Sequence, residues 1–247
     1  MTKTLNWGIL GAAHFAKNFI LPAIMTSKGN TIAALATRDP EKAAPFQTVQ
    51  PSLRIYNDYD SLLEDDGIDA VYIPLPNTLH VEWTKKAVAA GKHVLTEKPI
   101  AMQAQEIDDL IALRDASGLL IAEAYMIVHH PQWHYAKKLY ESGVIGTLWA
   151  VDSVFSYNNA TDPSNIRNRP ETGGGSLPDI GVYTFGSARF VTGEEPTKIL
   201  SADITWENNV DVWSHIRAEF PSFRFSSTTS MRIAPRQEVT FHGEKGF

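Results

Sequence analysis

Glu97 and Lys98 close an apolar run in the segment HVLTEKP, residues 93–99. The run predicts a short buried strand, and Pro99 prevents the strand from continuing. In open α/β sheets, ligands bind at the carboxyl ends of the strands. The carboxylate and the amine are therefore candidates for chemistry, and the alternative is that they form only a solvated strand end.

A second candidate pair, Asp179 and Tyr183, follows the glycine triplet 173–175. The pattern predicts a helix from Ser176 to Val191, and residues four apart lie one above the other on a helix face. A carboxylate and a phenol in this arrangement suit proton transfer. The structural alternative for Asp179 is a capping box with Ser176.

A glycine turn near the N-terminus suggests a place for a dinucleotide. Residues 5–10 predict a buried parallel strand, and an apolar helix that Pro22 should kink follows the turn. Free N–H groups at such a helix start can bind a pyrophosphate. The match to the dinucleotide-binding motif is incomplete, because an alanine replaces its second glycine, and an ordinary strand–helix turn is the alternative. The candidate cofactor contacts are Gly11, Ala13, His14, Phe15 and Ala16.

The end of the second predicted strand, residues 31–37, indicates which dinucleotide is preferred. An NAD site favours a carboxylate there, but the chain has Thr37 and Arg38, and Asp39 is better explained as the N-cap of a helix that begins at Pro40. Arginine is a fixed charge that binds phosphate in a bidentate manner. These residues favour NADP as the cofactor, with NAD possible. The alternative is that Arg38 is an ordinary surface arginine that binds no cofactor.

Six predicted strands alternate with helices in residues 1–124, which indicates a doubly wound Rossmann domain. The strands are expected at 5–10, 31–37, 53–56, 68–73, 93–97 and 119–124. The loop after the fourth strand contains Leu75 and Asn77, and His80 opens the next helix, so all three lie near the carboxyl edge. His130 and His134 are one helical turn apart, but spacing places no third ligand, so no metal site is predicted.

Residues 125–247 predict an α+β domain with an open, mainly antiparallel sheet. Its strands are expected at 147–157, 198–206, 212–220, 223–232 and 238–242, with a long loop at 158–175. Trp149, Val151, Phe155 and Tyr157 should share one face of the first of these strands. Large residues elsewhere in the sheet predict an uncovered face that forms a homo-oligomer interface, with a sheet edge near Phe241; they are Trp206, Trp213, Phe223 and Phe225.

Composition narrows the class of partner. The 247 residues have a formal net charge of −6 and no basic cluster, so nucleic acid and anionic membrane surfaces are not expected partners. The absence of cysteine excludes disulfides and thiolate chemistry. The N-terminal apolar run is too short for a signal peptide or a membrane span, so a cytoplasmic location is expected.

The whole chain resembles the glucose–fructose oxidoreductase, inositol dehydrogenase and MocA (Gfo/Idh/MocA) family. The resemblance is carried by GILG at 8–11, NTLH at 77–80, GKHV at 91–94, EKP at 97–99, HP at 130–131 and GGGSLPDIGVY at 173–183. The region around Asn168 and Tyr183 most resembles the D-xylose dehydrogenase and trans-dihydrodiol dehydrogenase branch, most of which uses NADP. Two departures are Val128, where many relatives have arginine, and an end at Phe247, where the family fold continues. We expect a truncated domain there.

The resemblance implies an NADP-dependent oxidoreductase that transfers a hydride between the nicotinamide and a hydroxyl-bearing carbon of a sugar, polyol or dihydrodiol. Lys98 and Tyr183 are then the candidate acid–base groups, and Asp179 orients one of them. These three residues and Arg167 are expected to contact the substrate, while Leu75, Asn77, His80, Glu97 and Lys98 complete the cofactor site. The alternative is a catalytically silent dinucleotide-binding sensor or scaffold. The sequence does not choose among the possible substrates.

Overall fold

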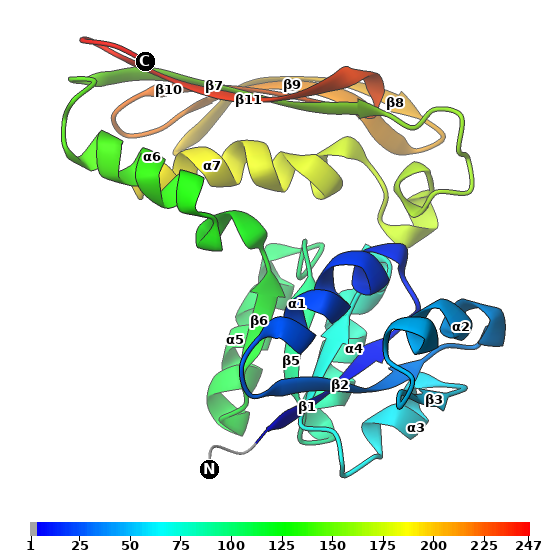
Figure 1. Ribbon diagram of the computed structural model, residues 1–247. Helices are drawn as coiled ribbons and strands as arrows, with labels where there is room; N and C mark the ends of the chain where they lie inside the picture. Colours follow the sequence, from blue (N-terminus) through cyan, green and yellow to red (C-terminus); the bar gives the residue numbers. More distant parts are fainter. Residues whose placement is uncertain (1–3) are drawn as a thin grey trace. The chain divides into compact units, whose positions relative to one another are not determined.

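The computed structural model describes residues 4–247. The chain forms two compact units, the first ending at Ala124 and the second beginning at Tyr125. Each unit has its own sheet and its own buried apolar residues, so each is described by itself (Figure 1).

The first unit is a six-stranded parallel sheet with the order β3-β2-β1-β4-β5-β6. The order reverses between β1 and β4, which is the switch point where doubly wound sheets bind ligands. The predicted Rossmann-like fold is confirmed. The strands are β1 (Leu5–Leu10), β2 (Asn30–Ala36), β3 (Arg54–Tyr56), β4 (Ala70–Ile73), β5 (His93–Glu97) and β6 (Ile121–Ala124).

Helices join these strands and bury apolar side chains against both faces of the sheet. One cluster is centred on Leu10 and Val71, and the other on Ile9 and Leu35, which point to opposite faces because side chains alternate along a strand. The helices are η1 (Ala16–Ile20), α1 (Leu21–Thr26), α2 (Pro40–Val49), α3 (Tyr59–Leu63), η2 (Asn77–Leu79), α4 (His80–Ala89) and α5 (Ala104–Ser117).

Two sequence predictions for these helices are confirmed in detail. Asp39 caps α2 by accepting a hydrogen bond from the backbone N–H of Glu41 at 3.0 Å, and Pro40 occupies the first turn. Pro22 lies at the start of α1, directly after the π-helical turn η1. Because proline has no N–H and its ring crowds the preceding turn, the interruption that Pro22 was expected to cause takes the form of a π-helical turn.

The second unit is a five-stranded sheet with the order β11-β7-β10-β9-β8. Every neighbouring pair is antiparallel except β10 with β7, which confirms the predicted mainly antiparallel sheet. The strand β11 forms one edge, as expected for the segment near Phe241. The strands are β7 (Leu148–Asn158), β8 (Lys198–Glu207), β9 (Val210–Glu219), β10 (Arg224–Ser230) and β11 (Arg232–Gly243).

Two helices, α6 (Pro131–Glu141) and α7 (Val182–Thr192), pack on one face of this sheet (Figure 1). Of the large residues that one helical layer was not expected to cover in full, Phe223 and Phe225 are each only 2% exposed, whereas Trp206 is 61% exposed. Phe225 packs against Phe185 of α7 with ring centroids 4.7 Å apart, so the helix covers it. Trp149, expected to share a strand face with Val151, is 69% exposed near the start of β7.

Candidate functional site

The glycine turn after β1 has the geometry that only glycine adopts easily. Gly11 has a φ of +107°, and a Cβ atom there would lie 3.0 Å from the Leu75 side chain. Its N–H donates to the Ala36 carbonyl at 2.9 Å, which ties the turn to β2. Helical backbone then begins at His14, and His14 and Phe15 are exposed. The turn thus leaves polar backbone and exposed side chains available to a ligand, whereas Leu75 is buried behind it.

Thr37 and Arg38 at the end of β2 have different surroundings. Thr37 is buried, and its hydroxyl accepts the Asp39 N–H at 3.2 Å, so it shapes the turn. Arg38 is exposed, and it has no hydrogen bond or ion pair within residues 4–247. Its charge lowers the pKa of Tyr59, although burial of that phenol has the larger effect and raises it. An uncommitted guanidinium at this strand end fits an additional phosphate group.

The carboxylate of Glu97 is hydrogen-bonded to a buried tyrosine. Tyr72 has no exposed surface, and its hydroxyl donates to Glu97 Oε1 at 2.7 Å. The backbone N–H of Lys98 contacts the other carboxylate oxygen at 3.3 Å. The carboxylate therefore lies between the core of the sheet and the backbone of Lys98, and Lys98 itself is half-buried at the end of β5, before a cis bond to Pro99.

His80 joins two loops at the carboxyl edge of the sheet. It is fully buried, with Nδ1 2.7 Å from the Pro99 carbonyl oxygen and Nε2 2.7 Å from the Leu75 carbonyl oxygen. Because both ring nitrogens contact backbone, these contacts support a positioning role for His80 rather than direct contact with a cofactor. Asn77 begins η2, three residues earlier, in the same loop.

In the second unit, Asp179 and Arg167 form an ion pair. The sequence analysis expected both residues to contact the substrate but did not predict that they contact each other. Arg167 Nε lies 2.8 Å from Asp179 Oδ2, and Asp179 is 8% exposed. Tyr157 at the end of β7 donates its hydroxyl to the same oxygen atom at 2.6 Å. Tyr157 was not among the candidate residues; the sequence only predicted that it shares a strand face with Trp149, Val151 and Phe155.

Burial and charge shift the pKa values of this cluster. Burial, followed by the Asp179 charge, raises the pKa of Tyr157 far above the ordinary value of 10.0. Burial lowers the pKa of Arg167, but the Asp179 carboxylate and then Tyr157 and Tyr183 raise it more, so the net change is upward. Arg167 therefore stays a cation and Tyr157 stays a neutral donor.

The loop before the helix is folded so that it presents Arg167. The N–H of Gly174 donates to the Arg169 carbonyl and that of Gly175 to the Arg167 carbonyl, both at 3.0 Å. A side chain at Gly174 would collide with the Arg167 carbonyl group. The glycine triplet is thus required for the loop to close on itself.

The helix that carries Asp179 and Tyr183 begins with a π-helical segment, η6 (Leu177–Gly181), and continues as α7. Ser176 makes no side-chain cap to this helix, so the alternative of a capping box with Asp179 is wrong. Asp179 instead uses its carboxylate for Arg167 and Tyr157.

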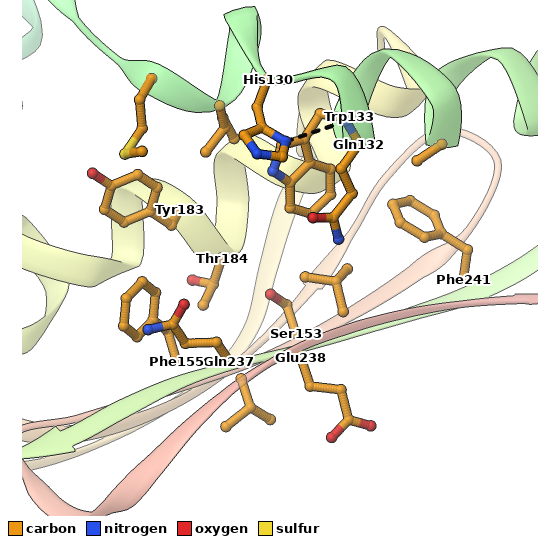
Figure 2. Close-up of a pocket in the computed structure, with 15 residues that line it drawn as sticks. His130, Gln132, Trp133, Ser153, Phe155, Tyr183, Thr184, Gln237, Glu238 and Phe241 are labelled. Carbon is orange, nitrogen blue, oxygen red and sulfur yellow. Dashed lines mark hydrogen bonds between the residues drawn. The ribbon is translucent and has the colours of Figure 1, made fainter. Parts of the chain in front are cut away.

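Tyr183 lies between two aromatic rings at the edge of a cavity of about 580 Å³. Its ring stacks on Tyr125 at 5.7 Å and tilts against Phe155 at 5.6 Å. Figure 2 shows its hydroxyl pointing away from Trp133, which lines another part of the cavity. Gly186 permits this arrangement, because a side chain there would collide with the Tyr125 hydroxyl, which donates to the Val182 carbonyl at 2.7 Å.

The histidines considered for metal binding have other contacts. His130 caps α6 by accepting the Gln132 N–H at 3.2 Å, and His134 packs edge-on against Phe190. Within residues 4–247, no group of three or more potential ligands has a metal-binding arrangement. No helix in this part of the chain is both long and apolar enough to span a membrane.

The parallel sheet, the glycine turn and the exposed Arg38 shortly after β2 are typical of a dinucleotide-binding protein of the Rossmann class. Two family models match the chain. Residues 5–125 match the oxidoreductase family with an NAD-binding Rossmann fold, and residues 133–247 match the GFO/IDH/MocA C-terminal domain. The chain belongs to the GFO/IDH/MocA oxidoreductase family, as its motifs indicated.

Three characterised proteins illustrate the similarity. A dTDP-3,4-didehydro-2,6-dideoxy-alpha-D-glucose 3-reductase of Saccharopolyspora spinosa is 39% identical over 86% of this chain and 64% of its own length. D-xylose 1-dehydrogenase (NADP+) 2 of Haloferax volcanii is 36% identical over 76% of this chain and 57% of its own. The 3-ketoreductase KijD10 of Actinomadura kijaniata, solved with NADP and TDP-benzene, gives a TM-score of 0.91 at 31% identity, covering 98% of this chain and 74% of KijD10.

Proposed function

We propose that this protein is an NADP-dependent oxidoreductase acting on a hydroxyl or keto group of a sugar or a related diol. The observation that carries the proposal is the family match across both units, joined to named oxidoreductases of sugars among its relatives. The chain spans less than two thirds of the length of those two relatives. The alternative of a silent sensor is less favoured, because Lys98, Asp179 and Tyr183 are all present.

The residues of the first unit fit NADP. Gly11 lets the backbone turn sharply before the helical residues, and Arg38 offers an uncommitted guanidinium for the 2′-phosphate. KijD10 was solved with NADP, and the H. volcanii relative carries NADP in its name. When bound, the nicotinamide supplies or accepts the hydride.

The acid–base work falls to Lys98 and Tyr183. In the oxidation direction, one of them takes the hydroxyl proton while the hydride leaves the same carbon, and reduction reverses both transfers. A free tyrosine has a pKa of about 10, so it acts as a base at neutral pH only where its surroundings favour the phenolate. Some of the KijD10 structures have a lysine or a tyrosine replaced, the same two residue types.

We propose that Arg167 and Asp179 of the second unit bind the substrate as a pair. The Arg167 cation, fixed by Asp179, can donate hydrogen bonds to hydroxyl or carbonyl oxygens of a bound sugar. Asp179 is occupied by Arg167 and Tyr157, so it acts in the proposal by orienting Arg167.

We also propose that the chain forms a homo-oligomer through the face of the second sheet opposite α7. This face has Trp213 and His215, whose rings stack with centroids 6.4 Å apart, among polar neighbours. An aromatic pair within a polar surface is typical of an interface core. A cytoplasmic location stays a prediction.

The enzyme proposal is tested by following the reduced nicotinamide absorbance with aldoses, polyols, dihydrodiols and nucleotide-linked keto sugars. We expect turnover with at least one class and with NADP(H) in preference to NAD(H). The Lys98→Ala variant serves as the matched control for background oxidation. A protein that binds NADPH tightly but turns over none of these classes would support the silent-sensor alternative instead.

A further inference from the structure

A buried carboxylate outside the proposed catalytic residues lies at the start of the helix that carries Asp179 and Tyr183. Asp211, the second residue of β9, is 4% exposed. The pairing of β8 with β9 passes from Thr205–Trp213 to Trp206–Asp211 and skips Val212. Such a bulge re-aims the next side chain. Asp211 therefore faces the same side of the sheet as Ser214.

Asp211 supplies the cap that the helix does not supply for itself. Its Oδ2 atom accepts the Leu177 N–H at 2.7 Å and the Ser176 hydroxyl at 2.6 Å. Leu177 is the first residue of η6, and the first N–H groups of a helix need acceptors from outside the helix. A carboxylate is also favoured by the positive end of the helix dipole.

The residues around the Asp211 carboxylate leave space for it. Gly175 has a φ of +130°, and a Cβ atom there would collide with Asp211 Oδ1. The Ser176 hydroxyl also lies 2.7 Å from Thr229 Oγ1, which lies 2.8 Å from Ser214 Oγ. A chain of buried hydroxyls thus ties the helix start to β10 and β9.

Burial of the Asp211 carboxylate is energetically unfavourable. Burial raises the pKa of Asp211, and the hydrogen bonds from Ser176 and Leu177 oppose that shift without cancelling it. A buried acid that is kept despite desolvation requires a compensating role or strong local contacts. The Ser176 hydroxyl and the Leu177 N–H at the helix start are among these contacts.

We propose that Asp211 is a positioning residue that fixes the helix carrying Asp179 and Tyr183, an inference that rests on the proposed function. Leu177 precedes Asp179 by two residues in one continuous helical run. Holding its N–H fixes the rotation and the depth of the first turn, and with them the oxygen atoms that meet the substrate. A misplacement of about 1 Å in a catalytic group can cost roughly 10²-fold in rate.

The test compares three substitutions at this position in the full chain. Asp211→Ala should lower kcat at least tenfold, with the Kd for NADPH within twofold of wild type. Asp211→Asn should restore most of kcat, because its carbonyl oxygen can still accept the Leu177 N–H. Asp211→Glu keeps the charge but pushes the carboxylate about 1.5 Å toward the helix, so it should remain impaired. The matched control is Asp203→Ala, an exposed aspartate on the neighbouring strand β8.

Hydrogen–deuterium exchange of the peptide 176–183 gives a readout that does not need turnover. We expect faster exchange in Asp211→Ala, wild-type protection in Asp211→Asn, and no change in Asp203→Ala. Unchanged exchange and kcat in a folded Asp211→Ala protein would overturn the inference. If that variant does not fold, Asp211→Glu performing better than Asp211→Asn in both readouts would overturn it. A wild-type protein without turnover contradicts the proposed function alone, since the exchange comparison still decides the role of Asp211.

Discussion

Tyr157 and Asp179 share a hydrogen bond of 2.6 Å between the end of β7 and the start of the helix, on the oxygen atom that also pairs with Arg167. The carboxylate therefore has a neutral donor on one side and a cation on the other. This geometry supports the proposal that Asp179 orients Arg167, because Oδ2 of Asp179 contacts both Tyr157 and Arg167.

The Tyr157 contact predicts a specific dependence of stability on pH. Tyr157→Phe should lower the free energy of unfolding at pH 7 by about 1–3 kcal/mol, because a buried acceptor loses its donor. Folding raises the pKa of Tyr157, so its contribution is fully present below pH of about 10 and declines above it as the unfolded chain ionises. Urea unfolding at pH 7 and above pH 10 should show the gap narrowing by roughly 1.4 kcal/mol per pH unit. The exposed Tyr135→Phe is the control, and a constant gap would contradict the assignment.

Cofactor preference is predicted to depend on Arg38. Arg38→Ala should weaken NADPH binding by about 1.5–3 kcal/mol, the scale of a charge-assisted hydrogen bond, and leave NADH binding nearly unchanged. Fluorescence titration of both cofactors measures this, with Arg114→Ala on α5 as the control arginine. Equal losses for the two cofactors would show that Arg38 does not meet the 2′-phosphate.

Catalysis is predicted to need both acid–base candidates. Lys98→Ala and Tyr183→Phe should each lower kcat by about 10²–10⁴-fold while NADPH still binds. Tyr135→Phe again provides the control substitution. Near-normal turnover in Tyr183→Phe would mean that Tyr183 only packs between Tyr125 and Phe155, where its ring stacks.

His80 is predicted to act through the backbone that it bridges. His80→Ala should reduce the free energy of unfolding by about 1–3 kcal/mol, because the contacts of its ring nitrogens with the Pro99 and Leu75 carbonyl oxygens are lost. The Kd for NADPH, measured in the folded protein, should change less than threefold. A large loss of NADPH affinity with unchanged stability would favour the direct cofactor contact that the sequence suggested. The exposed His129→Ala is the matched control.

The oligomer proposal is tested at Trp213. We expect light scattering to show a dimer at micromolar concentration, with a buried area of about 800 Å² per partner. Trp213→Glu should shift the mass toward the monomer, whereas Trp149→Glu, at an exposed tryptophan of β7, should not. A monomeric wild-type protein would exclude this interface.

The parts of the fold that local sequence determines could be predicted. The alternation of strands and helices, the Gly11 turn and the Asp39 cap each depend on residues close together in the chain, and the structure has them. The large residues of the second sheet could not be divided between a covered and an open face, because strand alternation shows that two faces exist without showing which one a helix covers.

The contacts that complete the site were beyond the reach of the sequence. Asp211 caps a helix that begins 34 residues earlier, and it faces that helix only because a bulge re-aims it. Tyr157 required knowing that β7 ends beside η6. Both contacts depend on tertiary placement, which neither motif nor periodicity encodes.

The loop 159–175 is held mostly from one side by Arg232, at the start of β11. Its Nη1 atom donates to the side-chain oxygens of Asn159 and Asn168 at 3.2 and 3.1 Å, and Asn168 in turn donates to two loop carbonyls. The conformation of this loop thus relies on a few asparagines and backbone groups. Exposed side chains that make none of these contacts can change during divergence without unfolding the loop, so new substrates could be acquired by descendants of one scaffold while its proposed hydride-transfer residues are inherited intact.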